Sequence, residues 1–278
     1  IYTFKYKPLV SIIIPVRKPS LRFFKEAINS VLNQIYDNWE LCIVDDASDS
    51  VRLRKEIADL AEGNARVKYL FNDKHGHISK TLNDGIRLAS GSFICFLDQD
   101  DVLSPYALYH IVRVLNQNRK IKWIYSDEDK ITTKGKRKSP HFKPDWNYDY
   151  LTSINYICHL VAIDHKILNK VGTFRTGFDG SQDWDLYLRL SNILNEDEIF
   201  HIPHILYHWR IHASSTSSKG VVKEYALTNA KKALESHFNE KNTPVAISNG
   251  SREDNRWHVL YKQETNPLVS LIVPTKDR

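Results

Sequence analysis

Residues 93–101 read Phe-Ile-Cys-Phe-Leu-Asp-Gln-Asp-Asp, an apolar run that stops at three carboxylates within four positions. A short apolar run bounded by turn residues is typical of a strand that is buried on both faces. Residues 40–46, Glu-Leu-Cys-Ile-Val-Asp-Asp, repeat this design, and residues 10–16 form a third apolar run. Segments of helical period separate the three runs. The sequence therefore predicts an α/β fold with a mostly parallel sheet flanked by helices.

The remaining elements follow from the same patterns. Helices are expected over residues 21–34, 52–62, 79–89, 107–115, 148–153, 165–171, 184–192 and 222–240, and further strands over residues 66–71, 123–126 and 204–210. In open α/β sheets, ligands bind beyond the carboxyl ends of the strands. The acidic residues at 45–46 and at 98–101 both follow predicted strands. The binding edge of the predicted sheet therefore carries two acidic clusters.

The composition is that of an ordinary globular protein, with 278 residues, 42% hydrophobic and 26% charged, and a net charge of +6. No apolar run approaches the roughly 20 residues of a membrane span, and the first residues lack a signal-peptide pattern. We expect a cytoplasmic location, with peripheral contact to the inner face of the cell membrane as an open alternative. The basic stretch 134–138 is expected to be a loop, either simply solvated or in contact with an anionic substrate or membrane surface.

The two ends of the sequence resemble each other. Residues 8–16 read Pro-Leu-Val-Ser-Ile-Ile-Ile-Pro-Val and residues 267–275 read Pro-Leu-Val-Ser-Leu-Ile-Val-Pro-Thr, identical at six of nine positions. A repeat with a domain-sized period predicts the beginning of a second, similar domain. The expected organisation is one catalytic domain over residues 1–220, a helix and linker over 221–266, and the start of the second domain over 267–278.

The carboxylates after the fourth predicted strand are a candidate metal site. Asp98, Asp100 and Asp101 repel one another, so their spacing favours neutralisation by a cation or by hydrogen-bond donors. Mg²⁺ and Mn²⁺ take oxygen ligands and commonly bridge one or two carboxylates to substrate phosphates. A polar turn that caps the next helix is the alternative. Asp45 and Asp46 offer acceptors to a nucleobase or ribose, with a helix cap again as the alternative.

Four motifs together resemble the family-two inverting glycosyltransferases of the GT-A fold. They are residues 8–16, Val-Asp-Asp-Ala-Ser at 44–48, Phe-Leu-Asp-Gln-Asp-Asp at 96–101, and Gly-Ser-Gln-Asp-Trp-Asp-Leu at 180–186. The resemblance covers about residues 8 to 215. Three further stretches, 125–130, 142–147 and 207–210, are similar to the branch of the family that assembles bacterial O-antigen and cell-wall polysaccharides, often as multi-domain chains.

The resemblance implies a role for each matching residue. Nucleoside and donor contacts are implied for Pro15, Val16, Asp45 or Asp46, Asp98 and Gln99; Mn²⁺ or Mg²⁺ contacts are implied for Asp98, Asp100 and His208. His208 is as readily a packed strand histidine, and Arg210 and His212 are possible phosphate partners. Asp183 would be the catalytic base, with helix capping as the alternative, and Asp185 is the weaker candidate. An inverting transfer has no covalent sugar intermediate.

The function expected from this resemblance is metal-dependent transfer of a sugar from a nucleotide-diphosphate sugar to a hydroxyl of a growing bacterial surface glycan. The expected partners are the nucleotide sugar, a glycan or lipid-linked glycan acceptor, and a second glycosyltransferase domain of the same chain. A catalytically silent carbohydrate-binding or scaffold module is one alternative. A nucleotidyltransferase is another, although residues 16–20, Val-Arg-Lys-Pro-Ser, lack the glycine-rich loop of that class. No nucleic-acid motif is present, so we expect no nucleic-acid partner.

Overall fold

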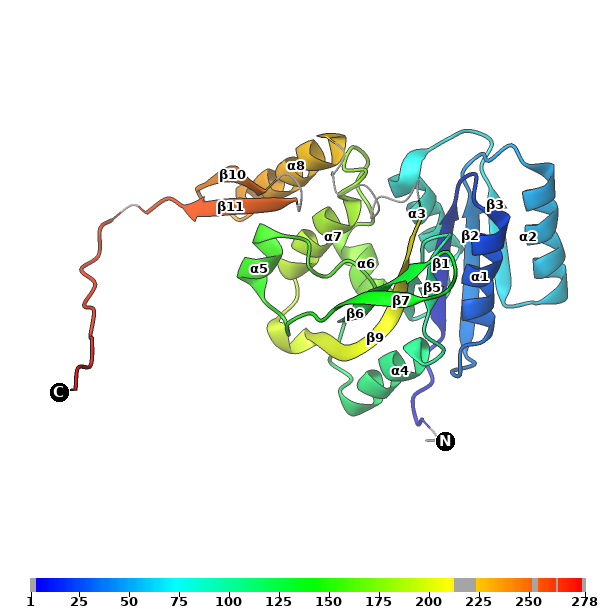
Figure 1. Ribbon diagram of the computed structural model, residues 1–278, viewed down its shortest axis with the longest axis horizontal. Helices are drawn as coiled ribbons and strands as arrows, with labels where there is room; N and C mark the ends of the chain where they lie inside the picture. Colours follow the sequence, from blue (N-terminus) through cyan, green and yellow to red (C-terminus); the bar gives the residue numbers. More distant parts are fainter. Residues whose placement is uncertain (1–3, 213–223, 252–254, 264, 277–278) are drawn as a thin grey trace.

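A computed structural model describes residues 4–212, 224–251, 255–263 and 265–276. Four parallel strands form one half of a nine-stranded sheet (Figure 1): β1 (Val10–Val16), β2 (Trp39–Asp45), β3 (Val67–Phe71) and β4 (Phe93–Phe96), in the order β3-β2-β1-β4. Every residue of β1 and β2 is buried. Burial on both faces explains why these strands read as continuous apolar runs, and it confirms the predicted α/β class.

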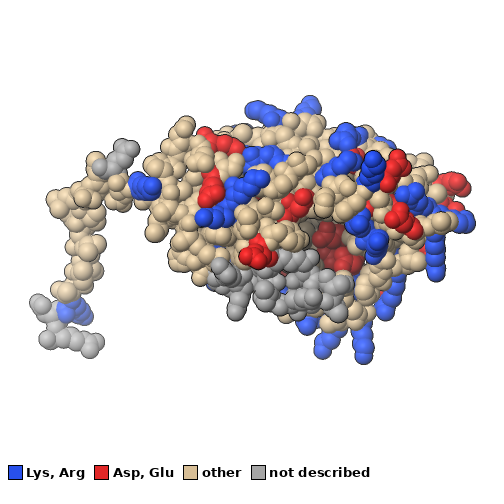
Figure 2. All heavy atoms as spheres, turned by 90° about the horizontal axis from the view of Figure 1, so that it is seen from above, with Lys and Arg blue, Asp and Glu red and all other residues tan. Residues whose placement is uncertain are grey.

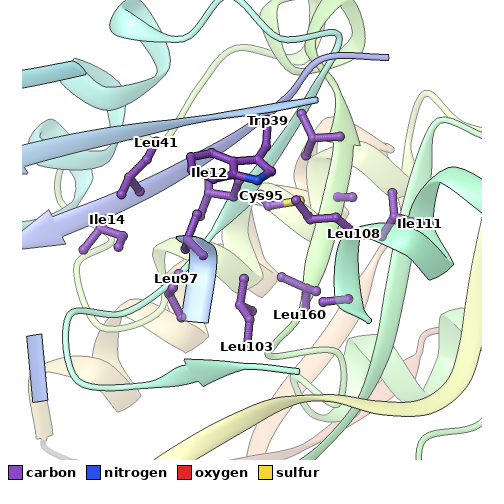
Figure 3. Close-up of a cluster of buried hydrophobic side chains, with 14 of the residues drawn as sticks. Ile12, Ile14, Trp39, Leu41, Cys95, Leu97, Leu103, Leu108, Ile111 and Leu160 are labelled. Atoms are coloured by element: carbon purple, nitrogen blue, oxygen red, sulfur yellow. The ribbon is translucent and has the colours of Figure 1, made fainter. Parts of the chain in front are cut away.

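Helices cover both faces of the parallel half. Helix α1 (Leu21–Leu32) and helix α2 (Val51–Gly63) pack on one face, and helix α3 (His77–Leu88) packs on the other. On the first face Ile12 and Ile14 of β1 meet the side chains of α1, together with Leu41 of β2; Figure 3 shows this cluster. On the second face Ile13 packs with residues of α3. Alternate side chains of β1 thus fill two cores, as the period of a strand requires.

The other half of the sheet is mixed. Strand β8 (Val161–Asp164) pairs antiparallel with β4, and β6 (Trp123–Thr132) follows it. Strand β9 (Ile199–Ile211) runs parallel to β6, and its far end pairs antiparallel with the short β5 (Val102–Leu103). Strands β6 and β9 are longer than the predicted 123–126 and 204–210. Residues 126–129 of β6, Ser-Asp-Glu-Asp, are buried polar residues, so the apolar pattern ends before the strand does.

The helices of the second half agree closely with the sequence expectation. Helix α4 (Ala107–Gln117) covers the first face. Four more helices lie on the second face: α5 (Tyr148–Ser153), α6 (His165–Val171), α7 (Gln182–Ser191) and α8 (Glu224–Glu240). Residues 222–223, expected to begin α8, lie outside the described part of the chain. Within that part, none of the helices combines the length and the apolar character that crossing a bilayer requires.

The basic stretch 134–138, expected to be a loop, instead forms a turn and the first residues of a strand. Strand β7 (Arg137–His141) pairs with the end of β6, and the Arg137 guanidinium lies 2.6 Å from the Asp129 carboxylate. The strand is exposed along its whole length. Because residues 137–141, Arg-Lys-Ser-Pro-His, have no apolar member, hydrophobic periodicity gave no signal for it.

The residues after α8 also differ from the expected connection. Strands β10 (Val245–Ser251) and β11 (Arg256–Tyr261) form an antiparallel hairpin that packs beside α5 and α8, with Trp257 buried in the second core. Residues 265–276 have no helix or strand and extend away from the body of the molecule (Figure 1). Ile272 of this stretch is 90% exposed. That these residues begin a second domain stays a prediction.

Polar contacts fix the edge of the sheet opposite the acidic clusters. Burial opposes ionisation of Glu40, but hydrogen bonds from Lys68, Ser11 and Ser90 outweigh it and lower the pKa of Glu40 to about 2. The Gly91 N–H donates to the Ser11 hydroxyl at 2.8 Å. A Cβ atom at Gly91 would lie 2.5 Å from that hydroxyl and 2.7 Å from the Ser11 backbone nitrogen. Only glycine allows this approach of the β4 turn to β1.

We predict that Gly91→Ala destabilises the fold by about 2 kcal/mol, because backbone atoms must move to admit the methyl group. Gly63→Ala is the matched control, since a Cβ atom there meets nothing within 4 Å and the position closes a helix. Its stability should change by less than about 1 kcal/mol, in the stabilising direction. Urea unfolding of both variants and the parent measures the difference. Equal midpoints for the two variants would contradict the packing argument.

Candidate active site

The carboxyl ends of β1, β2 and β4 meet at one edge of the sheet and border a cavity of about 640 Å³, which we call the strand-end cavity. Six of its lining residues were singled out from the sequence: Pro15, Val16, Asp46, Asp98, Gln99 and Asp100. Its other walls come from the start of α3, the loop before α7, and α8. Figure 2 shows acidic side chains set back in a hollow on one face of the molecule.

A second cavity of about 560 Å³ adjoins the first, and Gly180 lines both. We call it the aromatic cavity, because four aromatic side chains line it: Tyr150, Tyr156, Trp184 and Trp209. Asp183 also lines it, with Glu128 and Asp129 of β6 and Lys130 and His141 near the β6–β7 hairpin. The two cavities therefore place Asp98 and Asp100 on one side of Gly180 and Asp183 on the other.

Asp45 and Asp46 have different surroundings. Asp46 lines the strand-end cavity, accepts the Gly76 N–H at 2.6 Å and lies 2.5 Å from Nδ1 of His75. Asp45 is fully buried below it; its Oδ2 lies 3.4 Å from Arg54, and its Oδ1 has no hydrogen-bond partner among the residues that the structure describes. Neither caps α2, because the Ser50 hydroxyl takes that role. Of the two, only Asp46 reaches the cavity directly.

Gln99 ties the loop after β4 to the loop after β1. Its side-chain oxygen accepts the Arg17 N–H at 2.7 Å, and its amide nitrogen lies 3.2 Å from the Arg17 carbonyl oxygen. This pair of hydrogen bonds, with the 2.7 Å contact from the Arg17 guanidinium to the Asp46 carbonyl, holds the floor of the strand-end cavity. Gln99 thus lines the cavity and also shapes it.

The three carboxylates of the acidic loop divide into two kinds. Asp101 is buried and accepts hydrogen bonds from the Tyr207 hydroxyl at 2.6 Å and the Arg210 N–H at 2.7 Å, so it joins the loop to β9. The side chains of Asp98 and Asp100 are 48% and 24% exposed and face the strand-end cavity. Asp101 is therefore structural, and the other two are available to a ligand.

Charge accumulates where the cavities meet. Protein surrounds Asp98 except on its cavity side, and this loss of water raises its pKa, with Asp100 and Asp183 adding to the effect. Burial also raises the pKa of Asp183, against the opposing effects of His159 and the hydrogen bonds from Trp184 and Asn155. A bound cation would relieve this repulsion. Among the described residues, however, no group of three His, Cys, Asp or Glu side chains is placed to hold a metal by itself.

His208, expected as a further metal ligand, does not line either cavity. It is buried, and its Nδ1 lies 2.6 Å from the Asp129 carboxylate. The reason is register: β5 and β9 run antiparallel with Val102 opposite His208, so residues beyond 208 approach Asp100. His212 is the histidine that contacts the Asp100 carboxylate. Arg210, between them, is buried and contacts Glu26 and the Asp100 carbonyl.

Asp183 and Asp185 occupy contrasting positions in the first turn of α7. One Asp183 oxygen accepts from the Asn155 amide at 2.8 Å, and the other accepts the Trp184 N–H, also at 2.8 Å. Asp185 is buried between two arginines, with 2.9 Å to Arg189 and a closer contact to Arg175. Asp183 is thus oriented in the aromatic cavity, whereas Asp185 is committed to an ion-pair network.

His159 is a site residue that the sequence did not reveal. Its ring stacks on Tyr207 at 4.6 Å between centroids, and its Nε2 lies 3.9 Å from the Asp98 carboxylate. The segment around it belongs to no motif, and the chain has twelve histidines, so no local pattern marked it. Two tryptophans, Trp184 and Trp209, line the aromatic cavity, whereas Trp146 packs against Trp123.

The fold is that of the GT-A glycosyltransferases, with the acidic loop at the carboxyl edge of the sheet. Residues 11–172 match the model of glycosyl transferase family 2, and the chain belongs to that family.

Two curated proteins are similar to almost the whole chain. Protein y4gI of Sinorhizobium fredii is 40% identical over 97% of this chain and 30% of its own length. The O-antigen biosynthesis protein RfbC of Myxococcus xanthus is 35% identical over 98% of this chain and 21% of its own length. The chain thus spans less than a third of either relative.

Two solved structures share the fold at low identity. S. aureus TarS in complex with UDP-GlcNAc has a TM-score of 0.65 at 17% identity, covering 82% of this chain and 66% of that one. The mannosyltransferase PcManGT of Pyrobaculum calidifontis, in complex with GDP-Man and Mn²⁺, has a TM-score of 0.61 at 17% identity, covering 86% of this chain and 65% of that one.

The contrast between the two acidic residues of α7 is testable. Asp185→Asn should lower the free energy of unfolding by about 3 kcal/mol, because buried Arg189 loses its charged partner. Asp183→Asn, two residues away, should change it by less than about 1 kcal/mol, since the amide oxygen still accepts one of the two hydrogen bonds. Chemical unfolding at pH 7 compares both with the parent protein. A stable Asp185→Asn variant would contradict the structural role.

Proposed function

We propose that this chain is a metal-dependent inverting glycosyltransferase that moves a sugar from a nucleotide-diphosphate donor to a hydroxyl of a bacterial polysaccharide. One observation carries the proposal: two cavities meet at Gly180, with two carboxylates exposed in one and Asp183 in the other. Two substrates bound in adjoining cavities bring a leaving group and an attacking hydroxyl to the same junction.

The strand-end cavity is the proposed donor site. Pro15, Val16 and Asp46 line the part between the ends of β1 and β2, where a nucleoside would lie beside them. Gln99 and Asp98 line the same cavity between this nucleoside region and the junction of the two cavities. UDP-GlcNAc in the TarS complex and GDP-Man in the PcManGT complex belong to this class of donor.

Asp98 and Asp100 are the proposed holders of Mn²⁺ or Mg²⁺, with His212 as the neighbouring candidate in place of His208. Burial raises the pKa of Asp98 against the opposing effect of His159, and Asp100 and Asp183 add to the rise, so a bound cation would stabilise the ionised carboxylate. Because no group of three His, Cys, Asp or Glu side chains is placed to hold a metal in the described part of the chain, the two carboxylates suit an ion that completes its shell with phosphate oxygens. When bound, such an ion neutralises the charge of the departing diphosphate.

Asp183 is the proposed general base. In a single displacement the acceptor oxygen bonds to the anomeric carbon, the bond from that carbon to the diphosphate oxygen breaks, and the hydroxyl proton passes to a carboxylate. Asn155 and the Trp184 N–H orient Asp183 and oppose the rise of its pKa, which favours the ionised form that accepts a proton. Trp209 and Tyr150 offer apolar faces to an acceptor sugar in the same cavity.

The proposed acceptor, further domain and location in the cell are inferred from the similar proteins. RfbC is an O-antigen biosynthesis protein by name, and both full-length relatives are several times longer than this chain. A glycan or lipid-linked glycan acceptor, a second glycosyltransferase domain and a cytoplasmic location at the membrane face are consistent with that setting. Lys130 and His141 at the mouth of the aromatic cavity suit an acceptor with some negative charge.

We predict that Asp183→Asn lowers the transfer rate by about 10² to 10⁴, because the amide cannot accept the proton. Binding of the donor with Mn²⁺ should stay within about threefold, since Asp183 lines the other cavity. Single-turnover transfer to a glycan acceptor and calorimetric donor binding measure the two effects. Full transfer activity in this variant would move the base to another residue, and inactivity of the parent protein on every donor would favour a silent carbohydrate-binding module.

We predict that Asp100→Ala removes the dependence of nucleotide binding on metal. The parent protein should bind UDP or GDP at least about tenfold more tightly with Mn²⁺ than with chelator, and the variant should show no such difference. His208→Gln is the control, because His208 contacts Asp129 and should leave metal dependence unchanged. Calorimetry with and without chelator makes the comparison. Identical affinities of the parent protein in the two conditions would remove the metal from the proposal.

A further inference from the structure

The junction of the two cavities is where the transferred sugar must lie. This inference rests on the proposed function: the diphosphate lies at Asp98 and Asp100 and the attacking hydroxyl at Asp183, so the anomeric carbon lies between them. Gly180 is the residue that both cavities share. Around it, the strand-end cavity is lined by Asp179 from the loop before α7 and by Tyr225 and Asn229 from α8.

Helix α8 is attached tightly to the loop that carries Gly180. The φ of Gly180 is +84°, and a Cβ atom there would lie 2.7 Å from the Tyr225 ring and 3.0 Å from Ala226 Cβ. The Ser181 hydroxyl donates to the Ala226 carbonyl at 2.8 Å, and the Asn229 amide donates to the Asp179 carbonyl at 2.8 Å. Only glycine permits both this backbone conformation and this approach. The first turns of α8 are therefore a fixed wall of the cavity.

Asp179 is anchored by one of its two oxygens. Its Oδ1 accepts the Ser79 N–H at 3.1 Å and the Ser79 hydroxyl at 2.7 Å, which satisfies the first turn of α3 from 100 residues away. Its Oδ2 makes no hydrogen bond with any part of the chain that the structure describes. Asn229 is similar: its amide nitrogen is used, and its amide oxygen accepts nothing from the described residues. Two half-buried side chains thus hold an unused acceptor on one cavity wall.

We propose that Oδ2 of Asp179 and the amide oxygen of Asn229 accept hydrogen bonds from hydroxyls of the transferred sugar and so select the donor. Both side chains are fixed by their other polar atom, so little conformational entropy is lost on binding. Two acceptors on one wall of the cavity favour a sugar with free hydroxyls at this position and disfavour one that lacks them. A site built to bind a hydroxyl rejects the analogue without it far more strongly than an apolar pocket rejects an extra group.

Asp179→Asn tests the pair without removing the anchor. The amide oxygen can still accept from Ser79, because the opposite orientation would direct the NH₂ group at two donors, so the cavity-facing acceptor becomes a donor. Asn229→Ala removes the second acceptor. Asn239→Ala, an exposed position further along α8, is the matched control. The thermal midpoint of each variant without ligand checks that the fold is retained.

The experiment compares affinities with Mn²⁺ for UDP and GDP and for the sugar nucleotides UDP-glucose, UDP-GlcNAc and GDP-mannose. The sugar nucleotide that the parent protein binds best is then used throughout. We expect Asp179→Asn and Asn229→Ala to bind the bare diphosphate as the parent does and to bind the sugar nucleotide about tenfold and about threefold more weakly. Asn239→Ala should match the parent in both.

Two failures are distinguishable. If the ratio of sugar-nucleotide to diphosphate affinity is the same in the parent protein and in both variants, Asp179 and Asn229 do not contact the sugar, and the inference is overturned while the proposed function stands. If the parent protein binds no nucleotide of the panel, the proposed function fails and this inference fails with it. A lower ratio in both variants, with unchanged thermal midpoints, supports the assignment.

Discussion

The parallel pairing of β1 with β2 and β4 is the constraint on which the site depends. All three strands are buried between helices on both faces, so their carboxyl ends must emerge at one edge, and the residues that follow each strand are brought together. Carboxylates placed after apolar strands therefore converge through the pairing of the strands that precede them. The opposite edge is fixed by Glu40 and the close approach at Gly91, which sets the register of the same three strands.

The acidic residues of this edge fall into two groups, one that stabilises the fold and one that faces the cavities. Asp101 and Asp185 are buried and fully engaged, the first with β9 and the second with two arginines. They hold in place the loop and the helix that carry Asp98, Asp100 and Asp183. These three face the cavities, and burial raises the pKa of Asp98 and of Asp183. Carboxyl groups with raised pKa values therefore lie where a charged substrate would bind.

The region matched by the family model, residues 11–172, supplies the strand-end carboxylates but not the whole site. Asp183 and α8 lie beyond it, and they complete the two cavities. The contacts of α8 with the loop at 177–181 join the wall of the strand-end cavity to the segment that begins α7. The wall of the strand-end cavity and the start of α7, which carries Asp183, therefore belong to one packed unit.

The sequence by itself determined the α/β class, the positions of most helices and strands, and the placement of two acidic clusters at one edge, because these follow from local hydrophobic period and from the direction of parallel strands. It missed β7, which carries no apolar alternation, and it also missed the β10–β11 hairpin, although Val245 and Ile247 of β10 and Trp257 and Val259 of β11 alternate toward the second core. Only the tertiary structure decided which carboxylates face a cavity and that His212, not His208, contacts Asp100. Those outcomes depend on the register of β5 with β9 and on contacts between residues 100 or more positions apart, such as Asp179 with Ser79 and Asp101 with Arg210, which no local pattern records.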